Sequence, residues 1–100
     1  MMFMQFSCIP AESSAATDAF AEAIINCWID REDRAEAESL ARSVIADQGW
    51  CVENLEDHYT ITREDYADGH SREGLEAYDN AERDGHSFIC HTYFAGPKLN

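Results

Sequence analysis

The stretch from Ala19 to Val52, AFAEAIINCWIDREDRAEAESLARSVIADQGWCV, decides the fold because it predicts a strand, a helix and another strand in succession. The helix is the best specified of the three. Asp33 and Glu36 lie three positions apart, as an N-cap residue and its reciprocal partner do in a capping box. Gly49 then marks the helix end as a left-handed residue. Between them, apolar residues recur at the three- and four-residue spacing of one buried helical face: Ala37, Leu40, Ala41, Val44 and Ile45. We therefore expect a helix from about Arg34 to Gln48.

The segment just before this helix, Ala19 to Asp30, fits two patterns. Phe20, Ile24 and Trp28 recur as on a helix, whereas the small and aliphatic residues at odd positions alternate as in a strand. The segment is rich in β-branched and aromatic residues, which favours a strand. A helix here would also run into the next helix without a stop signal. We therefore predict a strand.

The rest of the chain adds three strands, a short turn and a second helix. Charged residues interrupt the alternation of the third strand and indicate a bulge or bend. Thr62 and Asp65 are spaced as a cap pair for a short turn that ends at Tyr66. The remaining predictions are strands over Met2–Ile9, Trp50–Thr62 and His86–Phe94, and a helix that begins after Ser71 and ends at Asp84 with Gly85 as its stop.

The elements follow one another as β-β-α-β-α-β, which predicts an α+β fold. We expect a two-layer sandwich in which two helices cover one face of a four-stranded, largely antiparallel or mixed sheet, with ferredoxin-like character. The 100 residues are expected to form a single domain spanning residues 1–100, with a flexible tail at 95–100.

The charge of the chain limits its partners. Seven lysines and arginines stand against 20 aspartates and glutamates, which gives a formal net charge of −13. Such a chain repels the phosphates of nucleic acids and of anionic membranes. The sequence has no targeting segment and no apolar stretch long enough to span a bilayer, so we expect a cytoplasmic protein.

The four cysteines do not indicate a metal or redox site. None is part of a C-x-x-C pair, which removes the strongest zinc and thioredoxin-like signals. In the cytoplasm they are expected to be reduced thiols, whether they have a role beyond packing stays open, and no cofactor is expected. They are Cys8, Cys27, Cys51 and Cys90.

Three large apolar residues of the second strand, Phe20, Ile24 and Trp28, predict a patch on one face of the sheet. Two helices on the opposite face would leave this face in water, and exposed apolar patches mark interfaces or ligand sites. We expect these residues to form the interface of a homodimer. Two alternatives stay open: another segment of the chain covers the patch, or a small apolar ligand binds to it.

A second group of residues lies between the third strand and the second helix: Asp65, Asp68, His70 and Glu73. Carboxylates and an imidazole could hold a divalent cation there. Their spacing matches no calcium-binding loop, and the helix dipole also favours acidic residues before a helix. We expect no metal site. If the protein does bind a metal ion, these four residues are the alternative ligand set.

Other candidate pairs do not combine into a catalytic site. Cys90 and His91 are adjacent on a strand, so their side chains should point to opposite faces. His58 follows Asp57, but the sequence places no nucleophile or oxyanion donor beside them. No serine lies in a G-x-S-x-G motif, and no glycine-rich phosphate loop exists. Enzymatic activity therefore has no supporting motif.

Several local motifs are similar to those of a group of small bacterial proteins of unknown function. They are Asn26-Cys27-Trp28-Ile29-Asp30, the alanine-rich helix, Gly49-Trp50-x-Val52, Asp84-Gly85-His86-Ser87-Phe88 and His91-Thr92-Tyr93. The resemblance covers most of the chain and implies a strand–helix–strand core and a bacterial, cytosolic origin. It transfers no functional residue.

The sequence predicts a non-enzymatic protein-interaction module that acts as a homodimer. The alternative is a protein that binds a small molecule or divalent metal through the open sheet face or the loop at 65–73.

Overall fold

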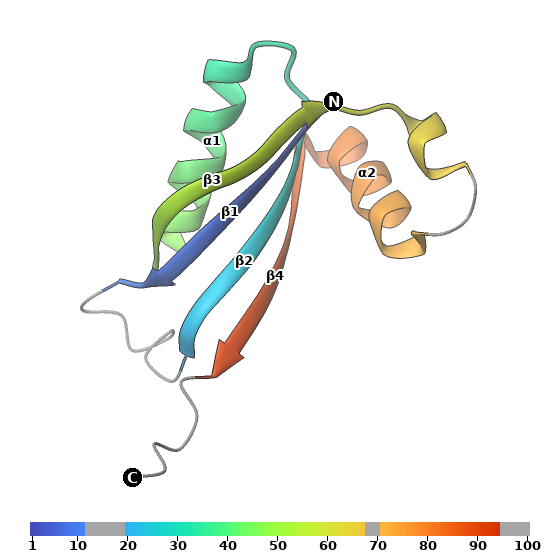
Figure 1. Ribbon diagram of the computed structural model, residues 1–100. Helices are drawn as coiled ribbons and strands as arrows, with labels where there is room; N and C mark the ends of the chain where they lie inside the picture. Colours follow the sequence, from blue (N-terminus) through green and yellow to red (C-terminus); the bar gives the residue numbers. More distant parts are fainter. Residues whose placement is uncertain (12–19, 68–70, 95–100) are drawn as a thin grey trace, which may run out of the picture.

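The computed structural model describes residues 1–11, 20–67 and 71–94, with seven elements of secondary structure (Figure 1). Their order along the chain is β1 (Met2–Pro10), β2 (Phe20–Ile29), α1 (Arg34–Asp47), β3 (Trp50–Thr60), the 3-10 helix η1 (Arg63–Tyr66), α2 (Arg72–Asp84) and β4 (His86–Phe94). The four strands form one antiparallel sheet in the order β3-β1-β2-β4. The predicted α+β class is confirmed, whereas the expected tail at 95–100 lies outside the described residues.

Local sequence signals set the ends of the helices. The Asp33 side chain accepts a hydrogen bond from the backbone N–H of Glu36 at 3.0 Å and so caps α1. The Ser71 hydroxyl caps α2 by accepting from the N–H of Gly74. Gly49 and Gly85 follow the two helices with φ values of 89° and 95°, in the left-handed region that glycine adopts without strain. These caps and stops confirm the predicted helix boundaries to within a residue or two.

The order of strands across the sheet does not confirm the expected ferredoxin-like character. β2 and β3 are both antiparallel to β1, which lies between them, so α1 joins two strands that run in the same direction. β3 and β4 form opposite edges of the sheet and run in opposite directions. α2 therefore connects one edge of the sheet to the other.

The prediction that both helices cover one face is wrong, because the two helices pack on opposite faces. Ala37 and Ala41 of α1 pack in one core with Phe6. Ala77, Tyr78 and Ala81 of α2 instead pack in a second core with Phe3 and Trp28, whose side chains point to the other side of their strands. We call these sides the α1 face and the α2 face. Both faces of β1 and β2 carry large apolar residues, and each helix covers one of them.

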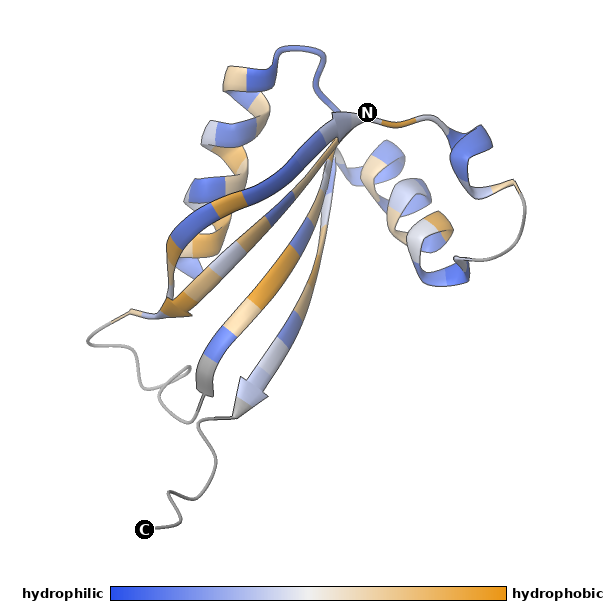
Figure 2. Ribbon diagram, viewed as in Figure 1, coloured by the Kyte–Doolittle hydropathy of each residue, from blue (hydrophilic) through white to orange (hydrophobic). Residues whose placement is uncertain are grey.

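The α1 face holds the main core. Its largest fully buried side chains, Phe6, Met4, Ile29, Ile45, Cys8 and Cys27, come from β1, β2 and α1. Figure 2 shows hydrophobic and hydrophilic residues alternating along β1 and β2, whereas β3 is largely hydrophilic. The central strands β1 and β2 are covered in part on both faces, whereas α1 packs against one face of β3 and α2 packs beside the beginning of β4.

The predicted irregularity in the third strand is confirmed. The pairing of β1 with β3 shifts between Gln5 and Phe6 and again between Ser7 and Cys8. The first shift leaves Glu56 as an extra residue in β3, and the second leaves Glu53, as in a β-bulge. The Glu56 carboxylate accepts a hydrogen bond from the Ser7 hydroxyl at 2.8 Å. The bulges therefore bend β3 and place carboxylates along this edge of the sheet.

Candidate functional site

β4 forms the second edge of the sheet, and its composition is unusual for an edge strand. Its nine residues, HSFICHTYF, include no aspartate, glutamate, lysine, arginine or proline. One side of β4 pairs with β2, and no strand among the described residues pairs with the other side. Natural proteins protect such edges with charges, prolines or bulges, because exposed backbone groups recruit further strands.

The opposite edge carries that protection. β3 has two bulges and three carboxylates, from Glu53, Glu56 and Asp57. These features prevent a second chain from adding to β3 in a regular ladder. The difference between the edges makes β4 the candidate interaction surface.

The hydrogen bonding between β2 and β4 shows which backbone groups of β4 point outward. The N–H of Asp30 donates to the carbonyl of Gly85 at 2.9 Å, and these residues lie opposite each other in the register. Hydrogen-bonded pairs alternate in an antiparallel ladder. Ser87, Ile89 and His91 therefore bond to β2. The outward-facing backbone groups belong to His86, Phe88, Cys90 and Thr92.

α2 limits the free part of this edge. It packs beside the beginning of β4, and the far end of the strand extends away from it (Figure 1). The stretch from His86 to Ile89 is half-buried, whereas Cys90, His91, Thr92 and Tyr93 are all exposed. The accessible edge is therefore Cys90–Tyr93.

A groove runs along the α1 face beside β4, with a volume of about 620 Å³. It exists because α1 lies closest to β3, and among the described residues no second helix covers the half of this face formed by β2 and β4. Its lining residues are Ile25, Val44, Ile45, Gln48, Trp50, His86, Ser87, Phe88, Cys90 and Thr92. None of these residues is an acid, a lysine or an arginine, although the chain as a whole is strongly acidic.

The thiol in this groove is not an activated nucleophile. Partial burial raises the pKa of Cys90 above its ordinary value. Its thiolate is therefore scarce at neutral pH, and thiol chemistry requires the thiolate.

The predicted patch of Phe20, Ile24 and Trp28 does not form as expected. Trp28 is only 4% exposed because α2 covers it, and its indole N–H donates to the Tyr66 hydroxyl at 2.9 Å. The expectation that Trp28 faces a partner is wrong. Its position agrees instead with the alternative that another segment of the same chain covers it. Ile24 is half-buried on the α2 face, and the side chain of Phe20 lies outside the described residues.

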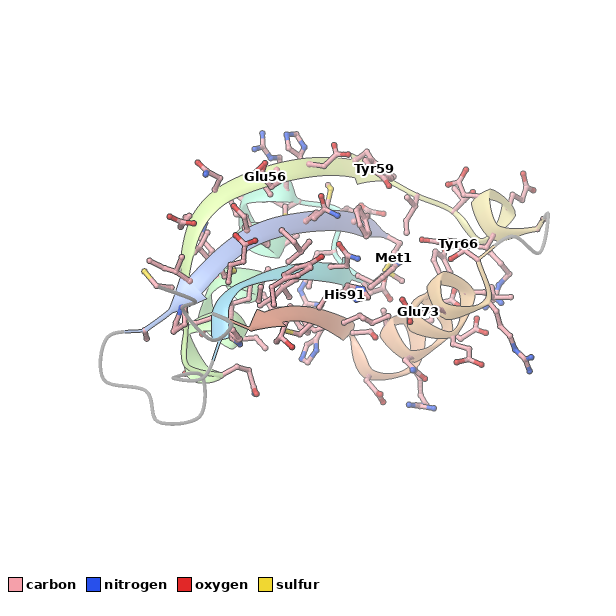
Figure 3. All side chains as sticks on the ribbon, turned by 60° about the horizontal axis from the view of Figure 1, so that its bottom comes forward. Met1, Glu56, Tyr59, Tyr66, Glu73 and His91 are labelled. Atoms are coloured by element: carbon pink, nitrogen blue, oxygen red, sulfur yellow. The ribbon has the colours of Figure 1, made fainter. Side chains whose placement is uncertain are left out.

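The part of the α2 face beyond α2 carries several polar contacts. Gln5 donates a side-chain hydrogen bond to Asn26 at 2.9 Å, next to the contact of Ser7 with Glu56. Figure 3 shows His91 of β4 near Glu73 of α2, and His91 Nε2 lies 3.9 Å from Glu73 Oε1. Among the described side chains, those of Tyr59 and Tyr93 are also exposed on this face.

The alternative metal residues are only partly described. The Asp65 carboxylate accepts a hydrogen bond from the backbone N–H of Thr62 at 2.8 Å, so it serves as a cap. Glu73 faces His91 instead of Asp65. Asp68 and His70 lie outside the described residues. Within the described ranges, no three histidine, cysteine or acidic residues are grouped closely enough to hold a metal ion.

The other candidate pairs are separated. Cys90 lines the groove on the α1 face, whereas His91 approaches α2 on the opposite face, as their adjacent positions predict. The Asp57 carboxylate accepts from the backbone N–H of His58. Tyr59 stacks near Phe3, with ring centroids 5.0 Å apart. The contact between Asp57 and His58 is thus made by the backbone of His58 and not by its ring.

The sequence-based argument identified β4 as a strand but not as the interaction surface. The signal was visible, since HSFICHTYF is a predicted strand of nine residues without an aspartate, glutamate, lysine or arginine. Its position at an edge is set by long-range pairing and could not be inferred from the strand itself.

Comparison with protein-family models, with curated proteins and with solved structures gave no match. The resemblance to small bacterial proteins therefore has no support from these comparisons. Among the described residues, neither helix has the length and apolar character needed to cross a lipid bilayer.

The protein has two buried thiols with raised pKa values, so we expect it to lose stability at alkaline pH. Burial raises the pKa of Cys8 from 9.0 to about 11 and raises that of Cys27 further. A thiol with a raised pKa in the folded state contributes stability that is complete below pH 9 and is lost as the pH rises. We expect the free energy of unfolding to fall above about pH 9, by up to about 1.4 kcal/mol per pH unit for each thiol.

Urea unfolding followed by circular dichroism between neutral pH and pH 10.5 measures this dependence. The matched control is the double variant Cys8→Ala/Cys27→Ala, which should be less stable at neutral pH but should show a shallower alkaline decline. Equal slopes for the wild type and the double variant would show that these thiols do not cause the loss.

Proposed function

We propose that the protein is a non-enzymatic interaction module that acts as a homodimer through the free edge of β4. Cys90–Tyr93 of one copy pairs antiparallel with the same residues of a second copy and joins the two sheets. The observation that carries the proposal is the uncharged, unprotected β4 edge, in contrast to the bulged and acidic edge at β3.

Charge favours this edge as the contact between two copies. Each chain carries a formal charge of −13, so close approach elsewhere on the surface brings carboxylates together. The β4 segment has no charged residue apart from any protonated histidine. Two acidic chains can therefore meet along β4 with little direct repulsion.

Symmetry also favours a second copy as the occupant. A two-fold axis places the same surface of each subunit at the interface, and two identical strands related by that axis are antiparallel. The pairing brings the exposed side chains of His91, Thr92 and Tyr93 next to those of the partner. Cross-strand pairs of this kind each contribute roughly 0.2–1 kcal/mol.

We infer a cytoplasmic location from the thiols. All four cysteines are free, and two of them, Cys51 and Cys90, are exposed. Exposed free thiols are typical of reducing compartments.

Sedimentation equilibrium at tens of micromolar protein tests the proposal. We expect a mass twice the 11.3 kDa of one chain, with dissociation on dilution. Added salt should strengthen the dimer, because it screens repulsion between the two acidic subunits. A mass of one chain throughout this concentration range would contradict the proposal.

A further inference from the structure

We infer that the groove on the α1 face is a binding site for an uncharged, largely apolar small molecule. The inference does not depend on dimerisation, because the groove is formed entirely by side chains of one copy. It follows from the shape of the groove, the chemistry of its walls and the charge around it.

The size and floor of the groove suit a small organic ligand. Its volume of about 620 Å³ lies within the roughly 300–1,000 Å³ of known small-molecule sites. Ile25 and Ile45 are buried beneath it, and Phe88 and Val44 are half-buried along it. A ligand that covers these side chains removes apolar surface from water, which favours binding.

A few polar groups stand among the apolar ones. Gln48 at the end of α1, His86 at the start of β4, and Thr92 near its end all line the groove. Small-molecule sites typically combine an apolar wall with a small number of polar groups that orient the ligand. The three side chains come from two separate elements, so they can contact different parts of one molecule.

Charge indicates that the ligand is neutral. An anion would approach a chain with a net charge of −13 and would find no lysine or arginine in the lining. A cation would find no carboxylate there, and Cys90 stays a neutral thiol because partial burial raises its pKa. Neither kind of ion gains a partner in the groove that offsets its desolvation.

Two fluorescent probes with the same ring system test the size and charge of the site. N-phenyl-1-naphthylamine is neutral and apolar, whereas 1-anilinonaphthalene-8-sulfonate adds one negative charge. We expect saturable binding of the neutral probe and binding of the sulfonate that is at least about tenfold weaker. Absence of saturable binding of the neutral probe, or equal binding of both, would overturn the inference.

Adjacent substitutions on β4 locate the site. Cys90→Trp places a large ring in the groove and should weaken binding of the neutral probe at least about tenfold. The matched control His91→Trp adds the same ring at the next residue, which is also exposed but lies on the α2 face, and should leave the affinity within about twofold. If both variants bind like the wild type, the probe binds elsewhere and the inference fails.

Two further measurements keep the outcomes distinct. Thr92→Trp also fills the groove, and it replaces Cys90→Trp if circular dichroism shows that the latter is unfolded. Sedimentation equilibrium of the same variants reports the dimer separately. Cys90 and Thr92 also lie on the proposed pairing edge, so Gln48→Trp, which fills the groove from the end of α1, separates the two roles and should weaken probe binding without changing the dimer. Loss of probe binding in Cys90→Trp and Thr92→Trp but not in Gln48→Trp would place the probe at the contact between copies and overturn the ligand assignment.

Discussion

Replacing Trp28 with alanine will release α2 from the sheet and lower the free energy of unfolding by about 3–5 kcal/mol. The Trp28 side chain is 4% exposed and belongs to the core formed with α2. Its ring packs edge-on against that of Phe3, with ring centroids 5.2 Å apart. Its N–H also donates to the Tyr66 hydroxyl, which links η1 to the sheet. Alanine removes all of these contacts and leaves a cavity between the two layers.

The loss of stability in Trp28→Ala should be large and should be concentrated in α2. Urea unfolding measures the total change, and amide hydrogen exchange shows where protection is lost. We expect faster exchange in α2 and little change in α1, because α1 packs on the opposite face. Trp28→Phe is the matched control: it keeps an aromatic ring, loses the hydrogen bond to Tyr66 and should cost about 1–2 kcal/mol. A loss below about 1 kcal/mol for Trp28→Ala would contradict the placement of this residue under α2.

Replacing Thr92 with proline will convert the proposed dimer into a monomer. The backbone N–H of Thr92 points away from β2, so a proline there removes a bond to a partner strand but none to the sheet. Prolines occur on natural edge strands in this orientation. We expect the folded variant to sediment as one chain at the concentrations at which the wild type forms a dimer.

The neighbouring residue provides a control of opposite orientation. The N–H of His91 bonds to β2, so His91→Pro removes a bond within the sheet and should lower the stability of the monomer itself. Thr92→Val keeps the N–H and a β-branched side chain and should leave the dimer intact. If Thr92→Pro is folded and still dimeric, the contact between copies does not use this edge.

Local structure was predictable from the sequence because its signals are local. Asp33 caps α1, and Gly49 and Gly85 adopt the left-handed conformations inferred from their positions. The predicted last strand, His86–Phe94, has the same bounds in the structure. The alternation in β2 also placed Trp28 on the opposite face from Cys27, as the structure shows.

The arrangement of these elements was less predictable because it depends on distant contacts. The sequence showed that β2 has two apolar faces but not that α2 would cross the sheet and cover Trp28. That outcome depends on α2 joining opposite edges and on Tyr66 meeting the indole. Because α2 packs on the other face of the sheet, no helix among the described residues covers the α1 face beside β4, and the groove there is open. The proposed site is therefore a consequence of topology that no single motif encodes.

Hydrogen exchange at the outward-facing amides of Cys90 and Thr92, measured residue by residue across a range of protein concentrations, tests the proposed pairing most directly. The account predicts that both amides become protected as the dimer forms and exchange rapidly when the protein is dilute. The amides of Ile89 and His91, which bond to β2, should be protected at every concentration and serve as the internal reference. Rapid exchange of Cys90 and Thr92 at tens of micromolar protein, with Ile89 and His91 protected, would contradict pairing through β4.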